Sequence, residues 1–237
     1  MKIGGVELTR EKLAQMMDFS SLNPDVSEDE ILKCCEITKK YNFKGFHVNP
    51  IWVPVVAREL EGTGIETGYV VSFPFGTNPT NLKVAEAEYA ASILKGKPWV
   101  IDMVTNVGKL KSKDYKYYKN DIAEVAKVAH DAGIECKAIL EVQLLTDEEI
   151  KIACELATEA GADWVKSSTG RHGGPSLKQV KLMRDCTPSH IKVKVAGTGN
   201  FWTPMVALGC IMAGAERIGT RNAPWIVDEL CELFSLE

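Results

Sequence analysis

Short apolar runs alternate along this chain with longer stretches in which apolar residues recur every three or four positions. The first pattern is typical of β-strands and the second of amphipathic helices, so the chain is predicted to repeat one strand–turn–helix unit. The predicted strands are Met16–Ser20, Gly45–Asn49, Thr67–Phe73, Trp99–Thr105, Cys136–Val142, Trp164–Ser167, Ile191–Val195 and Glu216–Gly219.

Capping residues mark where several helices begin. Residues 27–30 (Ser-Glu-Asp-Glu) form a capping box before a helix that runs to about Tyr41, and residues 146–149 form a second one before a helix to about Thr158. At residues 203–204, a threonine cap precedes a proline at the first helical position. The remaining predicted helices are 79–95, 114–132, 176–185 and 222–235.

Strands that alternate with helices predict a parallel sheet, because parallel neighbours need a long crossover connection. Eight such units predict the α/β fold class, as a (β/α)8 TIM barrel with a short N-terminal helix, formed by residues 1–237 as a single domain. An open, doubly wound sheet is the alternative, since the pattern does not reveal whether the strands close. The dinucleotide-binding form of that sheet has no support, because no G-x-G-x-x-G motif opens the first helix.

The charge balance restricts the partners. The chain has 28 Lys and Arg against 32 Asp and Glu, a formal net charge of −4. A nucleic-acid-binding domain usually has a strongly basic face. We therefore expect no nucleic-acid partner, although a local cationic pocket for a small anion is compatible with this average.

Cysteine usage predicts a reducing compartment. The seven cysteines show no C-x-x-C spacing and lie mostly in apolar stretches, and the four histidines are far apart, so we expect no metal site. The N-terminal residues lack the apolar core of a signal peptide, and the apolar part of the uncharged stretch 195–215 is shorter than the ~20 residues that span a bilayer. We expect a cytoplasmic protein with no membrane partner.

Charged residues interrupt several predicted strands. Strict alternation places Lys192 and Lys194 on one face of their strand, Lys166 lies near the end of another, and Asp102 lies inside an apolar run. Further charged strand positions are Asp18, and Lys137 and Glu141, which share a face.

A buried charge is costly unless it is paired, so these residues have two interpretations. One is an ion-pair network that seals the barrel. The other is chemical: one lysine pairs with Asp102, while the second has its pKa lowered by the like charge and by desolvation. A lysine near neutrality is a nucleophile for Schiff-base formation with a carbonyl substrate. The carboxyl ends of barrel strands usually carry the chemistry, which favours the second interpretation.

Glycine-rich turns follow the last three strands, at residues 167–174, 196–200 and 218–222. Each alone indicates no more than a tight turn. Three in succession, with Arg171 and Arg221 beside them, predict an anion site built from backbone N–H groups, as is common in the last loops of such barrels.

The segment Val165-Lys166-Ser167-Ser168-Thr169-Gly170 resembles the Schiff-base motif of the deoxyribose-phosphate aldolase family. The resemblance covers most of the chain, and Val193-Lys194-Val195-Ala196-Gly197 carries its other specific motif. The supporting segments are residues 17–24, 48–50, 72–76, 101–104, 144–149 and 215–220.

The resemblance implies a role for each catalytic candidate. Lys166 matches the lysine that forms the imine and enamine with acetaldehyde, Lys194 the second lysine that lowers its pKa, and Asp102 the acid of the proton relay. The implied lyase activity is the reversible cleavage of 2-deoxy-D-ribose 5-phosphate to glyceraldehyde 3-phosphate and acetaldehyde, in deoxyribonucleotide catabolism. It implies no metal or organic cofactor, small-molecule aldehyde and sugar-phosphate substrates, and a homo-oligomer, expected to be a dimer.

The recognition residues depart from the family pattern. Two serines that usually hold the phosphate are replaced by Arg221 and Asn222, Val100 replaces an acid, and His47, which we interpret first as a packed or surface residue, replaces a cysteine of some members. Arg221 can bind phosphate, fill the pocket or select a carboxylate. The alternatives are therefore a related lysine-dependent aldolase with a non-phosphorylated or carboxylate-bearing acceptor, and a non-catalytic barrel paralogue. The expected substrate-binding residues are Ser20, Thr169, Gly170, Arg171, Gly197, Thr198, Gly199, Gly219, Arg221 and Asn222.

Overall fold

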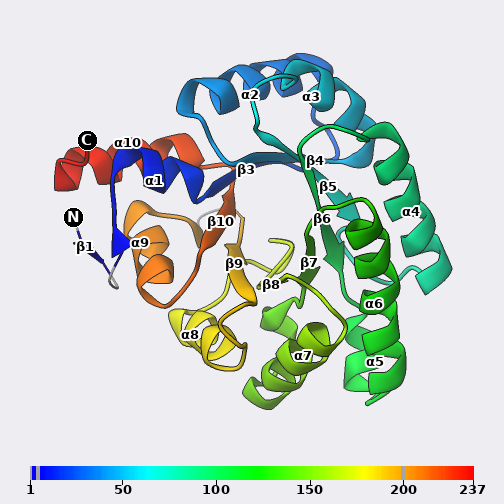
Figure 1. Cartoon of the computed structure of the whole chain (residues 1–237). Coiled ribbons are helices and arrows are strands. Elements are labelled where there is room, and N and C mark those ends of the chain that lie inside the picture. The colour runs from blue at the N-terminus through cyan, green and yellow to red at the C-terminus, as the bar shows by residue number, and fades with distance from the viewer. Residues whose placement is uncertain (1, 4–5, 199–200) are drawn as a thin grey trace.

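The computed structural model describes residues 2–3, 6–198 and 201–237. Eight parallel strands close into a barrel surrounded by helices (Figure 1). Because the last strand, β10, pairs with the first barrel strand, β3, the predicted (β/α)8 barrel is confirmed and the open-sheet alternative is wrong. The barrel strands are β3 (Met17–Ser21), β4 (Gly45–Val48), β5 (Glu66–Val71), β6 (Trp99–Val104), β7 (Cys136–Ile139), β8 (Trp164–Lys166), β9 (Lys192–Ala196) and β10 (Arg217–Thr220).

The helices begin where the sequence places their caps. Ser27 and Thr146 each accept a hydrogen bond from the backbone of the third helical residue and complete the two predicted capping boxes, and Thr203 caps its helix as predicted. The short N-terminal helix is also present as α1. The α-helices are α1 (Arg10–Gln15), α2 (Glu28–Tyr41), α3 (Val53–Glu59), α4 (Thr80–Ile93), α5 (Val107–Lys111), α6 (Tyr115–Asp131), α7 (Asp147–Glu159), α8 (Leu177–Asp185), α9 (Pro204–Met212) and α10 (Ala223–Phe234).

Some elements differ from the sequence prediction. The strand expected at 136–142 ends at Ile139, because Glu141 has a left-handed φ of 55° and starts the 3-10 turn η2 (Val142–Leu144). Lys137 and Glu141 therefore do not share a strand face. The pattern did not locate α3, α5, the 3-10 turn η1 (Pro50–Trp52) or the hairpin of β1 (Lys2–Ile3) and β2 (Val6–Glu7), all of which are short.

The register of the barrel collects charged side chains in its interior. Lys166 on β8 pairs with Lys194 on β9, which pairs with Arg217 on β10, so three cationic residues form one row across neighbouring strands. Asp102 on β6 pairs with Lys137 on β7. These five side chains are buried, while the apolar faces of the helices pack around the outside of the strands.

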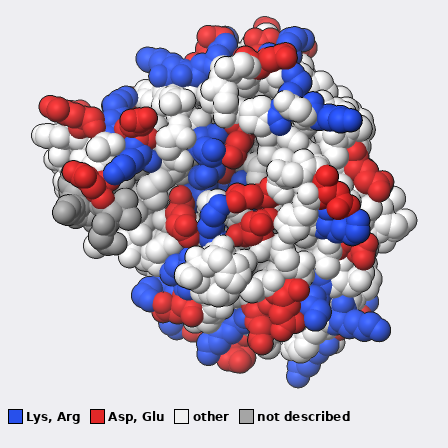
Figure 2. All heavy atoms as spheres, viewed as in Figure 1, with Lys and Arg blue, Asp and Glu red and all other residues white. Residues whose placement is uncertain are grey.

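On the face of the molecule shown in Figure 2, basic and acidic side chains are interspersed, with both signs present at the centre, over the barrel strands. In the described residues, no helix has the length and apolar character needed to cross a membrane.

Candidate active site

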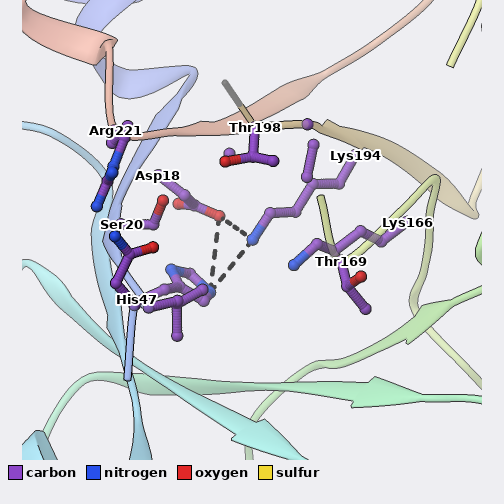
Figure 3. Close-up of a pocket in the computed structure, with 13 residues that line it drawn as sticks. Asp18, Ser20, His47, Lys166, Thr169, Lys194, Thr198 and Arg221 are labelled. Atoms are coloured by element: carbon purple, nitrogen blue, oxygen red, sulfur yellow. Dashed lines mark hydrogen bonds and ion pairs between the residues drawn. The ribbon is translucent and has the colours of Figure 1, made fainter. Parts of the chain in front are cut away.

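A cavity opens among the carboxyl ends of the barrel strands (Figure 3). Parallel strands bring their last residues and the loops that follow to one end of the barrel, where side chains far apart in sequence meet. Both lysines singled out by the sequence reach this cavity from neighbouring strands. Its lining residues are Asp18, Ser20, Leu22, Asn23, His47, Lys166, Thr169, Lys194, Ala196, Gly197, Thr198, Gly219 and Arg221.

The two lysines share one carboxylate oxygen. Lys166 Nζ lies 2.8 Å and Lys194 Nζ 2.7 Å from Asp102 Oδ2. Lys194 Nζ also lies 2.7 Å from Asp18 Oδ2 on β3. Lys194 therefore contacts two carboxylates, whereas the ion pair of Lys166 within the described residues is with the oxygen that it shares with Lys194.

This asymmetry separates the pKa values of the two amines. Burial lowers the pKa of Lys166 to about 8, with a further contribution from the Lys194 charge, although Asp102 opposes both effects. Burial acts on Lys194 as well, but Asp102 and Asp18 outweigh it and raise the pKa of that amine. Lys166 is therefore the amine that loses its proton near neutral pH, while Lys194 stays charged.

Two further cationic side chains contact the same carboxylates. Arg217 donates a hydrogen bond of 2.9 Å to Asp18, and Lys137 Nζ lies 3.5 Å from Asp102. The cations around Asp18 and Asp102 hold the pKa values of both carboxyls well below the usual range, although burial alone would raise them. Burial lowers the pKa of Lys137. The interior is thus an ion-pair network, as the first interpretation predicts, and it also contains a lysine with a lowered pKa, which the second interpretation requires.

The loop after β8 is anchored over the lysines. Glu141 accepts hydrogen bonds from the Thr169 hydroxyl at 2.5 Å and from the Thr169 backbone N–H at 3.3 Å. Ser168 donates to the carbonyl of Ala196, the last residue of β9, at 2.6 Å. These contacts hold the loop that follows Lys166 against the end of β9, so the lysine and both glycine-rich loops share one cavity wall.

The structure separates the predicted site residues into two groups. Asp102 is completely buried beneath the cavity, in contact with both lysines. Gly170, Arg171 and Asn222 do not line the cavity: Gly170 packs beside Thr198, the Arg171 guanidinium lies 6.0 Å from the Phe75 ring centroid, and Asn222 forms the N-cap of α10. Gly199 falls outside the described residues. The predicted residues that line the cavity are Ser20, Lys166, Thr169, Lys194, Gly197, Thr198, Gly219 and Arg221.

The sequence analysis did not include three charged or polar residues of the cavity wall, Asp18, Asn23 and His47, among the site residues. Asp18 was noted only as a charged strand position, and it contacts Lys194 directly. His47, interpreted as packed or surface-exposed, is 2% exposed and lines the cavity, so the surface alternative is wrong. The period-two alternation of β3 and β4, which turns Asp18, Ser20 and His47 inward, is the signal that could have found Asp18 and His47.

The described residues contain no group of three or more His, Cys, Asp or Glu side chains placed to hold a metal ion. All seven cysteines are free. What the cavity offers chemically is an amine with a depressed pKa next to a permanent ammonium and a shared carboxylate, a set suited to covalent catalysis on a carbonyl group.

Comparison with known proteins supplies relatives over nearly the whole chain. The sequence model of the DeoC/LacD aldolase family matches residues 12–200. A deoxyribose-phosphate aldolase of Thermococcus kodakarensis is 42% identical over 224 residues, which cover 93% of this chain and 98% of that protein.

Solved structures agree in fold. A candidate deoxyribose-phosphate aldolase from Coccidioides immitis superposes with a TM-score of 0.86 at 33% identity, covering 97% of this chain and 90% of that one. The deoxyribose phosphate aldolase of Aeropyrum pernix, described as tetrameric, has a TM-score of 0.85 at 25% identity over 95% of this chain and 93% of its own.

Proposed function

The chain belongs to the DeoC/LacD family of aldolases, and from this premise we propose that it cleaves 2-deoxy-D-ribose 5-phosphate reversibly to glyceraldehyde 3-phosphate and acetaldehyde through an imine on Lys166. The observation that carries the proposal is the pair of lysines on Asp102 Oδ2, of which Lys166 has a pKa of about 8. A neutral amine is the form that attacks a carbonyl carbon.

The side chains of the cavity can supply the nucleophile and the proton-transfer groups that the reaction needs. Lys166 Nζ attacks C1 of the open-chain sugar, and the resulting carbinolamine loses water to form an imine. Removal of the proton from the C3 hydroxyl breaks the C2–C3 bond, which releases glyceraldehyde 3-phosphate and leaves an enamine. Protonation of the enamine at C2 gives the acetaldehyde imine, and water then releases acetaldehyde and the free amine. Asp102 and Lys194 are the groups beside Lys166 that can hold the transferred protons.

The cavity wall supports a sugar-phosphate substrate at its outer end. Gly197 and Thr198 follow β9 and Gly219 lies near the end of β10, where backbone N–H groups suit an anion, and Arg221 after β10 lines the same cavity. Figure 3 shows Thr198 and Arg221 in this wall. Thr169, held by Glu141, lines the cavity next to Lys166. We propose these residues and Ser20 as the substrate-binding set, and Gly170 and Arg171 as a flanking group outside the cavity.

Imine trapping tests the proposal. Incubation with acetaldehyde and borohydride, followed by digestion and mass analysis, should place a two-carbon adduct on Lys166. Lys166→Leu should keep the fold and lose both the adduct and the cleavage activity. Lys192→Leu is the matched control, because Lys192 lies on β9 but not in the cavity wall. Absence of an adduct on Lys166 in the parent protein would refute the mechanism and favour the non-catalytic paralogue.

Arg221 favours a second candidate, a lysine-dependent aldolase with a carboxylate-bearing or non-phosphorylated acceptor. Its side chain is exposed and lines both the catalytic cavity and an adjoining groove that includes Asn23, Lys33 and Asn222. Cleavage rates for phosphorylated, non-phosphorylated and carboxylate-bearing deoxy sugars separate the candidates. If the guanidinium binds the anion, Arg221→Ser should raise the KM for the anionic substrate about ten-fold.

We also propose a cytoplasmic homodimer. Free cysteines fit a reducing compartment. Leu177, Met205 and Met212, on the neighbouring helices α8 and α9, are exposed apolar side chains suited to self-association. Light scattering of the purified protein tests the dimer, and Met212→Glu should shift it toward a monomer if this surface forms the interface.

A further inference from the structure

His47 touches three charged groups of the active site with one ring atom. It lies on β4, points into the barrel and is 2% exposed. Its Nε2 atom lies 3.2 Å from Lys194 Nζ and 3.9 Å from Asp18 Oδ2 (Figure 3), and 3.3 Å from Asp102 Oδ1. The imidazole therefore stands where the side chains of β3, β6 and β9 converge.

The contact between Lys194 Nζ and His47 Nε2 has the geometry of a hydrogen bond, whichever atom carries the proton. Asp102 Oδ1, although close to the ring, has no hydrogen-bond partner in the described residues. An ammonium has three N–H donors and no acceptor. Lys194 donates one hydrogen bond to Asp102 Oδ2 and forms an ion pair with Asp18 Oδ2. A ring that accepts at Nε2 therefore gives the ammonium a second hydrogen bond.

The protonation state of His47 follows from its surroundings. Burial lowers its pKa, and the Lys194 charge lowers it further, while Asp102 and Asp18 oppose this shift. The ring is therefore neutral near pH 7. Its other nitrogen, Nδ1, is buried without a hydrogen-bond partner in the described residues, whichever tautomer forms. The neighbours of Nε2 therefore decide the tautomer, and a charged Lys194 selects the one in which Nε2 accepts.

A glycine on the next strand makes room for the ring. His47 pairs with Gly68 on β5, and a Cβ atom at position 68 would lie 2.3 Å from the imidazole Cγ and Cδ2. Such a separation is far inside van der Waals contact, so any residue other than glycine would displace the ring. Glycine inside a strand weakens it and often marks a close approach of this kind. Gly68 therefore fixes where the imidazole lies, and β5 brings no charge to it.

We propose that His47 is a positioning residue for the aldol reaction: its neutral ring, packed on Gly68, accepts a hydrogen bond from Lys194 and keeps the positive charge on that amine and off Lys166. The proposal rests on the proposed function of Lys166. Without an acceptor at position 47, the charged form of Lys194 loses one hydrogen bond and is less stable. Lys166 then competes better for the charge of Asp102. The proton then stays on the nucleophile to higher pH.

The test follows adduct formation between acetaldehyde and Lys166, trapped with cyanoborohydride, as a function of pH. The parent protein should show a midpoint near pH 8, set by Lys166. His47→Phe keeps a flat ring on Gly68 but removes the acceptor, and should raise the midpoint by about one unit, which lowers adduct formation at pH 7 about ten-fold. His47→Gln restores an acceptor and should stay within about three-fold of the parent at pH 7.

Gly68→Ala provides an independent perturbation. The residue at position 47 stays a histidine, but the new methyl group displaces its ring from Lys194. The variant should therefore show the same pH shift as His47→Phe. In a His47→Ser background there is no ring to displace, so Gly68→Ala should cause little further shift of the pH midpoint. Substrate KM should change less than kcat in all these variants, because His47 acts through Lys194 and not on the distal part of the substrate.

The outcomes are distinguishable. If the parent protein forms no adduct on Lys166, the proposed function fails. If it does, and folded His47→Phe or Gly68→Ala keeps the parent midpoint, the role of His47 is overturned. If His47→Phe does not fold, as judged by circular dichroism, the pH midpoint of Gly68→Ala, compared with its His47→Ser control, tests the role of His47.

Discussion

Replacing Lys194 by methionine tests the electrostatic core of the mechanism. The substitution removes the ammonium that lies 2.7 Å from both Asp102 Oδ2 and Asp18 Oδ2, and leaves an apolar chain of similar length. Lys166 then becomes the only lysine in contact with Asp102 Oδ2. The like charge that lowers the pKa of Lys166 disappears, and the attraction of Asp102 is no longer shared, so both changes raise that pKa.

The magnitude follows from the fraction of neutral amine. With a pKa of about 8, roughly 9% of Lys166 is neutral at pH 7, against roughly 0.04% for an unperturbed lysine of pKa ~10.4. If the pKa returned to the unperturbed value, Lys194→Met would lower the rate of imine formation at pH 7 about 200-fold; burial of Lys166 persists in the variant, so we expect a decrease of up to that size. Because a depressed pKa favours the neutral amine above that pKa, activity of the parent rises with pH through about 8, and that of the variant rises at higher pH.

The assay is the pH dependence of acetaldehyde trapping on Lys166 from about pH 6 to 11, a range that covers both midpoints. Lys192→Met is the control, since Lys192 lies on the same strand, pairs with Glu135 and lacks contact with the cavity. A Lys194→Met profile that coincides with the parent would refute the assignment of the pKa shift to Lys194. A rate that stays low even at high pH would show instead that Lys194 is required as a proton donor.

Three further predictions concern the supports of the site and fold. Glu141→Gln should weaken the hold on Thr169 and lower kcat/KM about ten-fold, mainly through KM, in steady-state cleavage kinetics; unchanged KM would show that this loop does not position substrate. In the parent, Lys83 Nζ lies 2.5 Å from the buried carboxylate of Asp121. Lys83→Met removes this charge partner and should lower the free energy of unfolding, measured in urea, by about 3–5 kcal/mol. Thr146→Ala removes the N-cap of α7 and should cost about 1 kcal/mol in the same assay, while the matching serine variant should not.

Local signals account for what the sequence analysis predicted correctly. Capping by Ser27 and Thr146 depends on residues three positions apart, and the strands follow from the periodicity of apolar residues, so both are visible without the fold. The boundary at Glu141 was misplaced because a left-handed backbone ends the strand inside an apolar run, and apolar patterning does not encode that φ angle.

Lys166 and Lys194 stood out because charge on the inward face of a buried strand needs a chemical reason, and alternation alone identifies that face. What alternation cannot tell is which inward groups touch. Contacts of Lys194 with Asp18 and His47 depend on the closure of β10 onto β3 and on the stagger of neighbouring strands. The position of Arg171 over the Phe75 ring, outside the cavity lining, is likewise decided by the fold.

The sequence by itself therefore determined the eight strand–helix units and the inward placement of Lys166, Lys194 and Asp102, because periodicity is a local property of the chain. Only the tertiary structure showed that the sheet closes into a barrel and which of the two amines has the lowered pKa. The difference between the amines depends on the number of carboxylates around each: two at Lys194 and one shared oxygen at Lys166. A pKa reflects burial and neighbouring charge in three dimensions, and those neighbours come from strands far apart in the chain.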